Sequence, residues 1–436
     1  MTIEFVSILI VVVLFGLLVI GVPFALGAGA IAVVVVLTHF GPDSLFLISS
    51  RTFEMVTDYI MVSIPMFVLM ASLLERSGIA RDLYSALQYY FGHRRGGVLV
   101  ATLLIAFVLG ATTGIVGGEV VLLGLVALPQ MMRLGYSNKL TLGAITAGGG
   151  MGTMLPPSIV LILYGITANV SIGDLFMASA TPAVMLMSFY ILYVVIRCRI
   201  DPTLAPPARP EDLGPRPDTG ALIRNIGLPL AVTLVVLGSI YLGIASITES
   251  AACGVLGILI SIAVRGELTG KLVMQALKQT MVTSGIVLWL VFGTNALIGA
   301  YNAIGGIAFA QSLFAGISQE PWILLAVVIV VFMILGLFID WIGILFLTTP
   351  IFLPLIRQAG FDPIWFGVIF NLTVQIAYLT PPFAPSAFYL KSVAPKSVSL
   401  SDIYKSSWPF IVMQVVALAL LIAFPQISLW LPQVMR

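Results

Sequence analysis

The chain has 436 residues, of which 60% are hydrophobic and 9% are charged, and its formal net charge is +2. Together with a mean hydropathy of +1.14, this composition excludes a soluble domain and indicates a polytopic membrane protein embedded in a lipid bilayer. No basic cluster predicts binding to nucleic acid. The two cysteines, Cys198 and Cys253, are too few for a disulfide framework, and the two histidines, His39 and His93, lie at predicted span ends.

The N-terminal apolar run, residues 5–39, is too long for one membrane span, and Gly21-Val22-Pro23 interrupts it. We expect two short spans there and another at 57–75, which together form a scaffold over residues 5–75. Glu4 precedes the run and no basic segment does, so the first span is predicted to be retained rather than cleaved as a signal peptide.

After Arg76, apolar residues recur about every four positions, at Ile79, Leu83 and Leu87. This pattern predicts a helix lying in the membrane interface, and a short solvated connector is the alternative. The next apolar run, 97–131, has basic flanks and breaks at glycines and threonines. We predict a re-entrant hairpin there, with its tip at 112–114, because both flanks prefer the same side of the membrane.

The run at 140–168 contains the stretch GGGMGTMLPPS at 148–158. Its glycines and paired prolines cannot continue a helix, and irregular backbone at membrane depth is tolerated only where protein covers it or it lines a cavity. We therefore predict a helix broken at mid-membrane, whose free backbone groups bind ions. A simple proline kink is the alternative. An ordinary span at 174–196 ends the first half, 1–196.

Residues 197–224 contain five arginines and six prolines, which predicts an extended linker on the cytoplasmic side. The second half, 225–436, repeats the first: Pro381 and Pro382 lie 225 residues after Pro156 and Pro157. At the same offset the repeat predicts spans at 226–264 and 282–300, a hairpin at 322–356, a broken helix at 365–393 and a last span at 409–431.

Each half then has five full crossings and one hairpin, so the second half is inverted relative to the first. Both termini fall on the periplasmic side, and only Arg51, Arg357 and Arg436 depart from the positive-inside tendency. The predicted fold is an all-α polytopic membrane protein of two inverted-topology repeats, each with a re-entrant hairpin and a broken helix.

Polar residues, glycines and prolines at the predicted tips and breaks form a candidate site for ions and substrate. Its members are Thr112, Thr113, Gly114, Gly150, Thr153, Pro156, Pro157, Ser158, Asp340, Asn371, Gln375, Thr380, Pro381 and Pro382. Small hard cations prefer oxygen ligands from carbonyls, amides and hydroxyls. Alternatively, these side chains satisfy broken backbone. The carboxylates of Asp340 and Glu119 are predicted to bind a coupling cation or to relay a proton. The alternative is that nearby hydrogen-bond donors neutralise them. No enzymatic motif is present, so we do not expect an enzyme.

Three motifs carry a family resemblance: GGGMGTMLPPS at 148–158, LGATTG at 109–114, and the run from Phe338 to Leu390 that contains LTTPIFLPLIRQAGFDPIWFGVI and LTPPFAPSAFYL. Over essentially its whole length the chain resembles the large membrane subunit of tripartite ATP-independent periplasmic (TRAP) transporters. The departures are Thr112-Thr113, where many relatives have serines, and Phe383-Ala384-Pro385-Ser386 after the second proline pair.

The resemblance implies a sodium-coupled secondary transporter of the bacterial inner membrane with an elevator-type architecture. It implies as partners a small four-span membrane subunit and a periplasmic substrate-binding protein, an organic acid anion as substrate, and sodium as coupling ion with no other cofactor. The sodium ligands would lie within the candidate set: the tip at 112–114 with the loop at 150–156, and Asp340 with the loop at 380–382.

Two other functions stay open at this point. One is a single-component divalent-anion/sodium symporter or proton-coupled antiporter of similar architecture. The other is a membrane scaffold that transports nothing.

Overall fold

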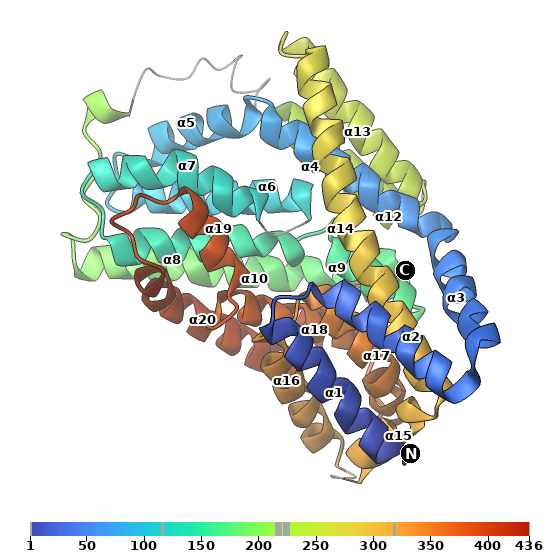
Figure 1. Ribbon diagram of the computed structural model, residues 1–436. Coiled ribbons are helices and arrows are strands. Elements are labelled where there is room, and N and C mark those ends of the chain that lie inside the picture. Colours follow the sequence, from blue (N-terminus) through green and yellow to red (C-terminus); the bar gives the residue numbers. More distant parts are fainter. Residues whose placement is uncertain (1, 115–116, 214–219, 221–226, 317–319, 436) are drawn as a thin grey trace.

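The computed structural model describes residues 2–114, 117–213, 220, 227–316 and 320–435, and every regular element in these ranges is a helix (Figure 1). The helices of the first half are α1 (Ile3–Val19), α2 (Phe24–Phe40), η1 (Pro42–Leu45), α3 (Phe46–Val56), η2 (Tyr59–Val62), α4 (Ser63–Arg76), α5 (Ile79–Phe91), α6 (Gly97–Thr113), α7 (Gly118–Arg133), α8 (Asn138–Gly149), η3 (Gly150–Thr153), α9 (Ile159–Ala168) and α10 (Ile172–Ile200).

After the short helix η4 (Pro210–Asp212), the second half follows the same order. Its helices are α12 (Leu228–Tyr241), α13 (Ile247–Val264), α14 (Gly270–Ala303), α15 (Gly306–Ala315), α16 (Pro321–Gly336), α17 (Trp341–Gln358), α18 (Pro363–Leu379), α19 (Pro385–Val393), α20 (Leu400–Ala423) and α21 (Gln426–Met435). Among the described residues, six helical segments are long and apolar enough to cross a membrane.

The repeat predicted from the paired prolines extends to the whole fold. Adding 225 to the first residue of α1, α2 or any of α5 to α10 gives, within three residues, the start of a helix in the second half. The segment from α3 to α4 corresponds in the same way to the single long helix α14. The all-α fold of two repeats, each with a helical hairpin and a broken helix, is therefore confirmed.

Contacts between the halves are reciprocal, as a two-fold relationship requires. Helix α9 of the first half packs on α17 of the second, and α19 of the second half packs on α7 of the first. Likewise α8 contacts α20, and α18 contacts α10. An odd number of crossings per repeat, as predicted from the sequence, places such a two-fold axis in the membrane plane and makes the repeats inverted.

The core of the protein surrounds the two broken helices. In α18 every side chain from Trp365 to Leu379 is buried, and in α8 so is every residue from Leu140 to Gly149. By contrast, α14 buries one stripe along α2 and exposes large apolar side chains elsewhere, as expected of a lipid-facing helix (Figure 1). The first break therefore lies inside protein, which is where irregular backbone is tolerated at membrane depth, whereas Pro382 and Phe383 of the second break are exposed.

Several predicted segments differ from the structure. The span predicted at 409–431 is wrong as a single helix: α20 ends at Ala423 and α21 begins at Gln426, because the residue before Pro425 avoids the helical conformation. In addition, α3 occupies a region expected to be a loop, and α14 extends well beyond the predicted span 282–300. Residue 226, where another predicted span begins, lies outside the described residues.

The linker is less extended than predicted where it is described. Ala205 and Ala208 are buried. The Ala205 carbonyl accepts a hydrogen bond from Gly96 N at 3.1 Å, and Ala208 N donates to Gly92 O at 2.9 Å. These bonds attach the linker to the connection between α5 and α6.

Two of the arginines that depart from the positive-inside tendency have structural contacts. Arg357 Nη2 donates to the Ala168 carbonyl at 2.7 Å, so it places a positive charge at the C-terminal end of α9. Arg51 lies against α14, since a Cβ at Gly299 would come within 2.8 Å of Arg51 Cδ. Arg436 lies outside the described residues.

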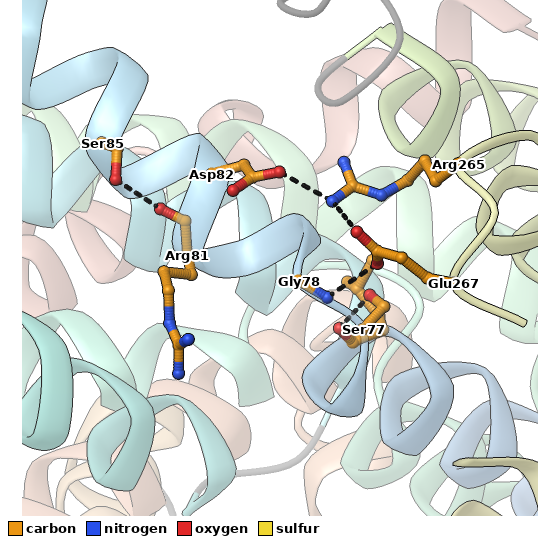
Figure 2. Close-up of polar contacts among 8 residues, drawn as sticks. Ser77, Gly78, Arg81, Asp82, Ser85, Arg265 and Glu267 are labelled. Atoms are coloured by element: carbon orange, nitrogen blue, oxygen red, sulfur yellow. Dashed lines mark hydrogen bonds and ion pairs between the residues drawn. The ribbon is translucent and has the colours of Figure 1, made fainter. Parts of the chain in front are cut away.

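A group of charged residues joins the two halves beside α5 (Figure 2). The Arg265 side chain is 4% exposed, and its Nη2 lies 2.7 Å from both Asp82 Oδ2 and Glu267 Oε1. Glu267 Oε2 also accepts a hydrogen bond from Gly78 N at 3.1 Å. The hydrogen bond from Arg265 lowers the pKa of the Glu267 carboxyl. This network fixes the loop after α13 to the start of α5.

Candidate functional site

The first break lies between α8 and α9 and is stabilised by its own hydroxyl groups. Thr153 Oγ1 donates to the Gly150 carbonyl at 3.2 Å, and Ser158 Oγ donates to the Thr153 carbonyl at 2.5 Å. Both side chains are buried. Pro156 and Pro157 lie between these two residues, joined by a cis peptide bond. The hydroxyls thus satisfy broken backbone, as the alternative interpretation expected.

The tip of the first hairpin contacts this break directly. Ile159 N, the first amide of α9, donates to the Gly114 carbonyl at 3.3 Å. Gly114 has a φ of +64°, and a Cβ there would overlap the Pro157 carbonyl, so this position requires glycine on both grounds. The structure therefore brings together the hairpin tip and the proline pair, which the sequence had placed in one site.

The two threonines of this tip point into their own hairpin. Thr112 Oγ1 donates to the Leu109 carbonyl at 2.7 Å, and Thr113 Oγ1 donates to Glu119 Oε1 in the following helix. Their hydroxyl hydrogens are therefore used within the hairpin and do not reach the loop at 150–156.

Helix α18 of the second half supplies the polar side chains around η3. Asn371 Nδ2 donates to the Thr153 carbonyl at 2.8 Å, and Gln375 Nε2 lies 3.5 Å from Met151 Sδ. Both residues lie in the helix before the second break, at the positions that Thr146 and Gly150 hold in the first repeat. The structure instead directs both side chains to the first break.

Three oxygen atoms beside η3 are buried and have no hydrogen-bond partner among the described residues: Asn371 Oδ1, Gln375 Oε1 and Ser386 Oγ. Ser386 belongs to α19, and a Cβ at Gly150 would lie 3.9 Å from its Oγ. A buried polar group without a partner costs about 1–3 kcal/mol. Neutral oxygens that lack partners match the ligand preference of a small hard cation.

Asp340 begins α17 at the tip of the second hairpin. Its Oδ2 accepts from Ile342 N at 3.3 Å, and its Oδ1 accepts from the Tyr378 hydroxyl at 3.2 Å. The carboxylate lines a small pocket whose other walls include Trp341, Phe383 and Pro385. Asp340 therefore meets the end of α18 next to the second break, with a tyrosine partner that sequence reasoning missed.

The second break uses local bonds of the same kind as the first. Thr380 Oγ1 donates to the Ile376 carbonyl at 2.8 Å, and the Pro382 carbonyl accepts from the Tyr404 hydroxyl at 3.1 Å. Pro381 and Pro382 are joined by a cis peptide bond, and Ala384 has a φ of +33°. Phe383 and Pro385, which follow the proline pair in the sequence, line the Asp340 pocket. Thr380 and the proline pair therefore lie beside this pocket.

Tyr389 of α19 lies against the tip of the first hairpin, and sequence reasoning did not include it in the site. A Cβ at Gly117 would lie 3.2 Å from the Tyr389 ring, which places the ring beside this tip. In the sequence, Tyr389 is marked only by its position 225 residues after Tyr164, the matching tyrosine of the first repeat. Tyr164 itself donates a hydrogen bond to the Pro363 carbonyl at 2.7 Å.

Comparison with known proteins gives a consistent result. The profile described as "Tripartite ATP-independent periplasmic transporter, DctM component" matches residues 11–427. The chain is 32% identical over 381 residues to the ectoine TRAP transporter large permease protein TeaC of Halomonas elongata, covering 85% of this chain and 86% of that protein. It is 28% identical over 403 residues to the C4-dicarboxylate TRAP transporter large permease protein DctM of Pseudomonas aeruginosa, covering 90% and 91%.

A third relative, the sialic acid TRAP transporter large permease protein SiaM of Vibrio cholerae, is 28% identical over 396 residues, covering 87% of each chain. Among solved structures, the Alcanivorax borkumensis YdaH transporter matches with a TM-score of 0.65 at 13% identity, covering 89% of this chain and 90% of that chain. This last likeness concerns the fold alone.

Proposed function

This chain belongs to the DctM family of tripartite ATP-independent periplasmic transporters, and we propose that it imports an organic acid anion by sodium-coupled transport. It is a large permease subunit, and its relatives are transporters rather than enzymes. The relatives carry the names of ectoine, C4-dicarboxylates and sialic acid, which all bear a carboxylate. A carboxylate-bearing substrate is therefore the class that we propose for this chain.

The observation that carries the sodium proposal is the set of three unpartnered oxygens beside η3. Asn371 Oδ1, Gln375 Oε1 and Ser386 Oγ come from two helices of the second half and face the break of the first. Sodium held there would satisfy these oxygens and hold α18 and α19 against η3. Asp340, with the loop at 380–382, provides the second proposed sodium position.

The substrate carboxylate would be held by the positive ends of α9 and α19, which both begin at the breaks. The first amide of α9 is already bonded to Gly114, so α9 contributes its following amides. No lysine or arginine lies among the residues that line the Asp340 pocket. Neutralisation of Asp340 by sodium would therefore have to precede approach of an anion, which gives a physical reason for coupling.

The remaining features of the proposal are the partners, the movement and the location. A periplasmic binding protein would deliver the substrate, and a small four-span subunit would pack against the lipid-facing helices. The hairpins and broken helices would slide as one body against the scaffold, in an elevator movement. The protein would lie in the bacterial inner membrane with the linker in the cytoplasm and both termini in the periplasm.

Two alternatives lose support. A single-component symporter or antiporter of this architecture would not be expected to match a family defined by tripartite systems over residues 11–427. A scaffold without transport gives no reason for the buried oxygens without partners beside η3, where the two halves meet.

Uptake into proteoliposomes that contain the chain, its small subunit and its binding protein tests the proposal. An inward sodium gradient alone should drive uptake of a carboxylate substrate, and a proton gradient alone should not. Uptake driven by protons without sodium would contradict the sodium assignment. Asp340→Asn should raise the sodium concentration needed for half-maximal uptake, whereas Asp43→Asn, in the exposed helix η1, should not.

A further inference from the structure

The tip of the first hairpin contains a buried carboxylate that the two sodium positions proposed above do not use. Glu119 is the second residue of α7 and is 1% exposed. Its Oε1 accepts the hydrogen bond from Thr113 at the end of α6, while its Oε2 is buried and has no partner among the described residues. An ionised carboxylate without a partner at this burial is costly, so Oε2 must either take up a proton or bind a cation.

A second carboxylate reaches the same place from a different part of the fold. Glu75 lies near the end of α4, and its carboxylate lies against Gly118, where any Cβ would overlap it. Gly118 and Glu119 are adjacent at the start of α7, so the Glu75 carboxylate lies against the residue that precedes Glu119. Helix α4 and the hairpin thus bring two acidic side chains together at the N-terminal end of α7.

The local charges compensate this pair only in part. None of the ion pairs found among the described residues includes Glu75 or Glu119. Arg76 is exposed, and its Nε points to Ser72 Oγ at 3.4 Å. The N-terminal end of α7 supplies only about half a positive charge. Two ionised carboxylates therefore leave an excess of more than one negative charge, which a single monovalent cation would nearly neutralise.

We propose that Glu119 and Glu75 form a further binding site for sodium, with the Thr113 hydroxyl oxygen beside it. The unpartnered Oε2 of Glu119 provides one ligand and the Glu75 carboxylate provides the others. The inference rests on the sodium-coupled function proposed above, and it adds an ion site that includes α4 as well as the hairpin. The site has no counterpart in the second half, where the equivalent positions are Ala300 and Ile344.

The test measures the melting temperature of the full-length chain in increasing sodium chloride, with choline chloride keeping the ionic strength constant. Sodium should raise the melting temperature of the wild type saturably. Glu119→Gln and Glu75→Gln should each raise the half-saturating sodium concentration about tenfold or more, because each removes one charged ligand. Glu54→Gln, in the exposed part of α3, is the matched control and should not change the titration.

Several results would overturn the site. One is a sodium titration of Glu119→Gln identical to that of the wild type; if this variant does not purify, Glu75→Gln decides in the same way. Another is stabilisation of the wild type by acid in choline with no response to sodium, since the pair would then hold a proton. If uptake did not depend on a sodium gradient while the melting temperature still responded to sodium, the transport proposal would be contradicted but the Glu119–Glu75 site would not.

Discussion

The amide of Asn371 donates a hydrogen bond to the carbonyl of Thr153 at 2.8 Å, and these two residues belong to opposite halves of the chain. Thr153 is the last residue of η3, in the break of the first broken helix, and Asn371 lies within α18, the helix before the second break. The first break is therefore held by a helix of the other repeat. An ion bound there would contact both repeats at once, so its binding would affect how they pack.

This relationship predicts the effect of removing the Asn371 side chain. Asn371→Ala removes one of the two hydrogen bonds to the Thr153 carbonyl, which keeps that from Ser158, and it removes one candidate sodium ligand. We expect a loss of about 0.5–1.5 kcal/mol in stability, the net contribution of one hydrogen bond, and a weaker response of the melting temperature to sodium. Asn302→Ala, at an exposed position of α14, is the control. A variant that melts and titrates like the wild type would contradict the role of Asn371.

A second prediction concerns the close contact at the tip of the first hairpin. Gly114→Ala combines a positive φ with overlap of the Pro157 carbonyl, so the hairpin must move away from the break. Gly360→Ala is the matched control, because Gly360 has a φ of +83° and open space around it. The Gly360→Ala variant should lose only the stability that it costs to hold alanine in the left-handed backbone conformation, about 1–2 kcal/mol. We expect Gly114→Ala to reduce both melting temperature and uptake further; equal effects would show that the contact is unimportant.

A third prediction separates the two groups at the second hairpin tip. Tyr378→Phe removes the hydroxyl that donates to Asp340 but keeps the carboxylate and the ring. Its effect on the sodium dependence of uptake should have the same direction as that of Asp340→Asn but be smaller. Tyr59→Phe, at an exposed position, should have no effect. If Tyr378→Phe were as severe as Asp340→Asn, the tyrosine rather than the carboxylate would be the main contributor.

The charged group beside α5 predicts a pH dependence. The hydrogen bond from Arg265 lowers the pKa of Glu267 in the folded protein. The carboxylate therefore contributes stability above its unfolded pKa of about 4.5, and this contribution is lost as the pH falls through the lower, folded value. Melting temperatures of wild type and Glu267→Gln should differ most above about pH 5 and converge in stronger acid. A difference that grows on acidification would contradict the sign of this shift.

Much of the fold could be predicted from sequence because its signals are local. The proline pairs at 156–157 and 381–382 break helices wherever they occur, and their common spacing located the second repeat. The break between α20 and α21 was missed although Pro425 marks it, because the apolar run around Phe424 was read as continuous. Hydropathy alone does not show where a helix stops.

The site could be predicted in its members but not in its contacts. Asn371 and Gln375 lie in the helix before the second break, yet their side chains reach the first break, in the other half. Tyr378, Tyr389 and Glu75 were missed altogether. Such contacts depend on how the repeats pack against each other, and a spacing along one chain carries no information on which face of α18 meets η3.

A high-resolution cryo-electron microscopy map of the complex in sodium chloride, compared with one in choline chloride, tests the central claim most directly. The account predicts density for a bound ion beside η3, within coordinating distance of the Asn371, Gln375 and Ser386 oxygens, only in sodium. Identical maps in both salts, with these oxygens bonded to one another or to water, would contradict it.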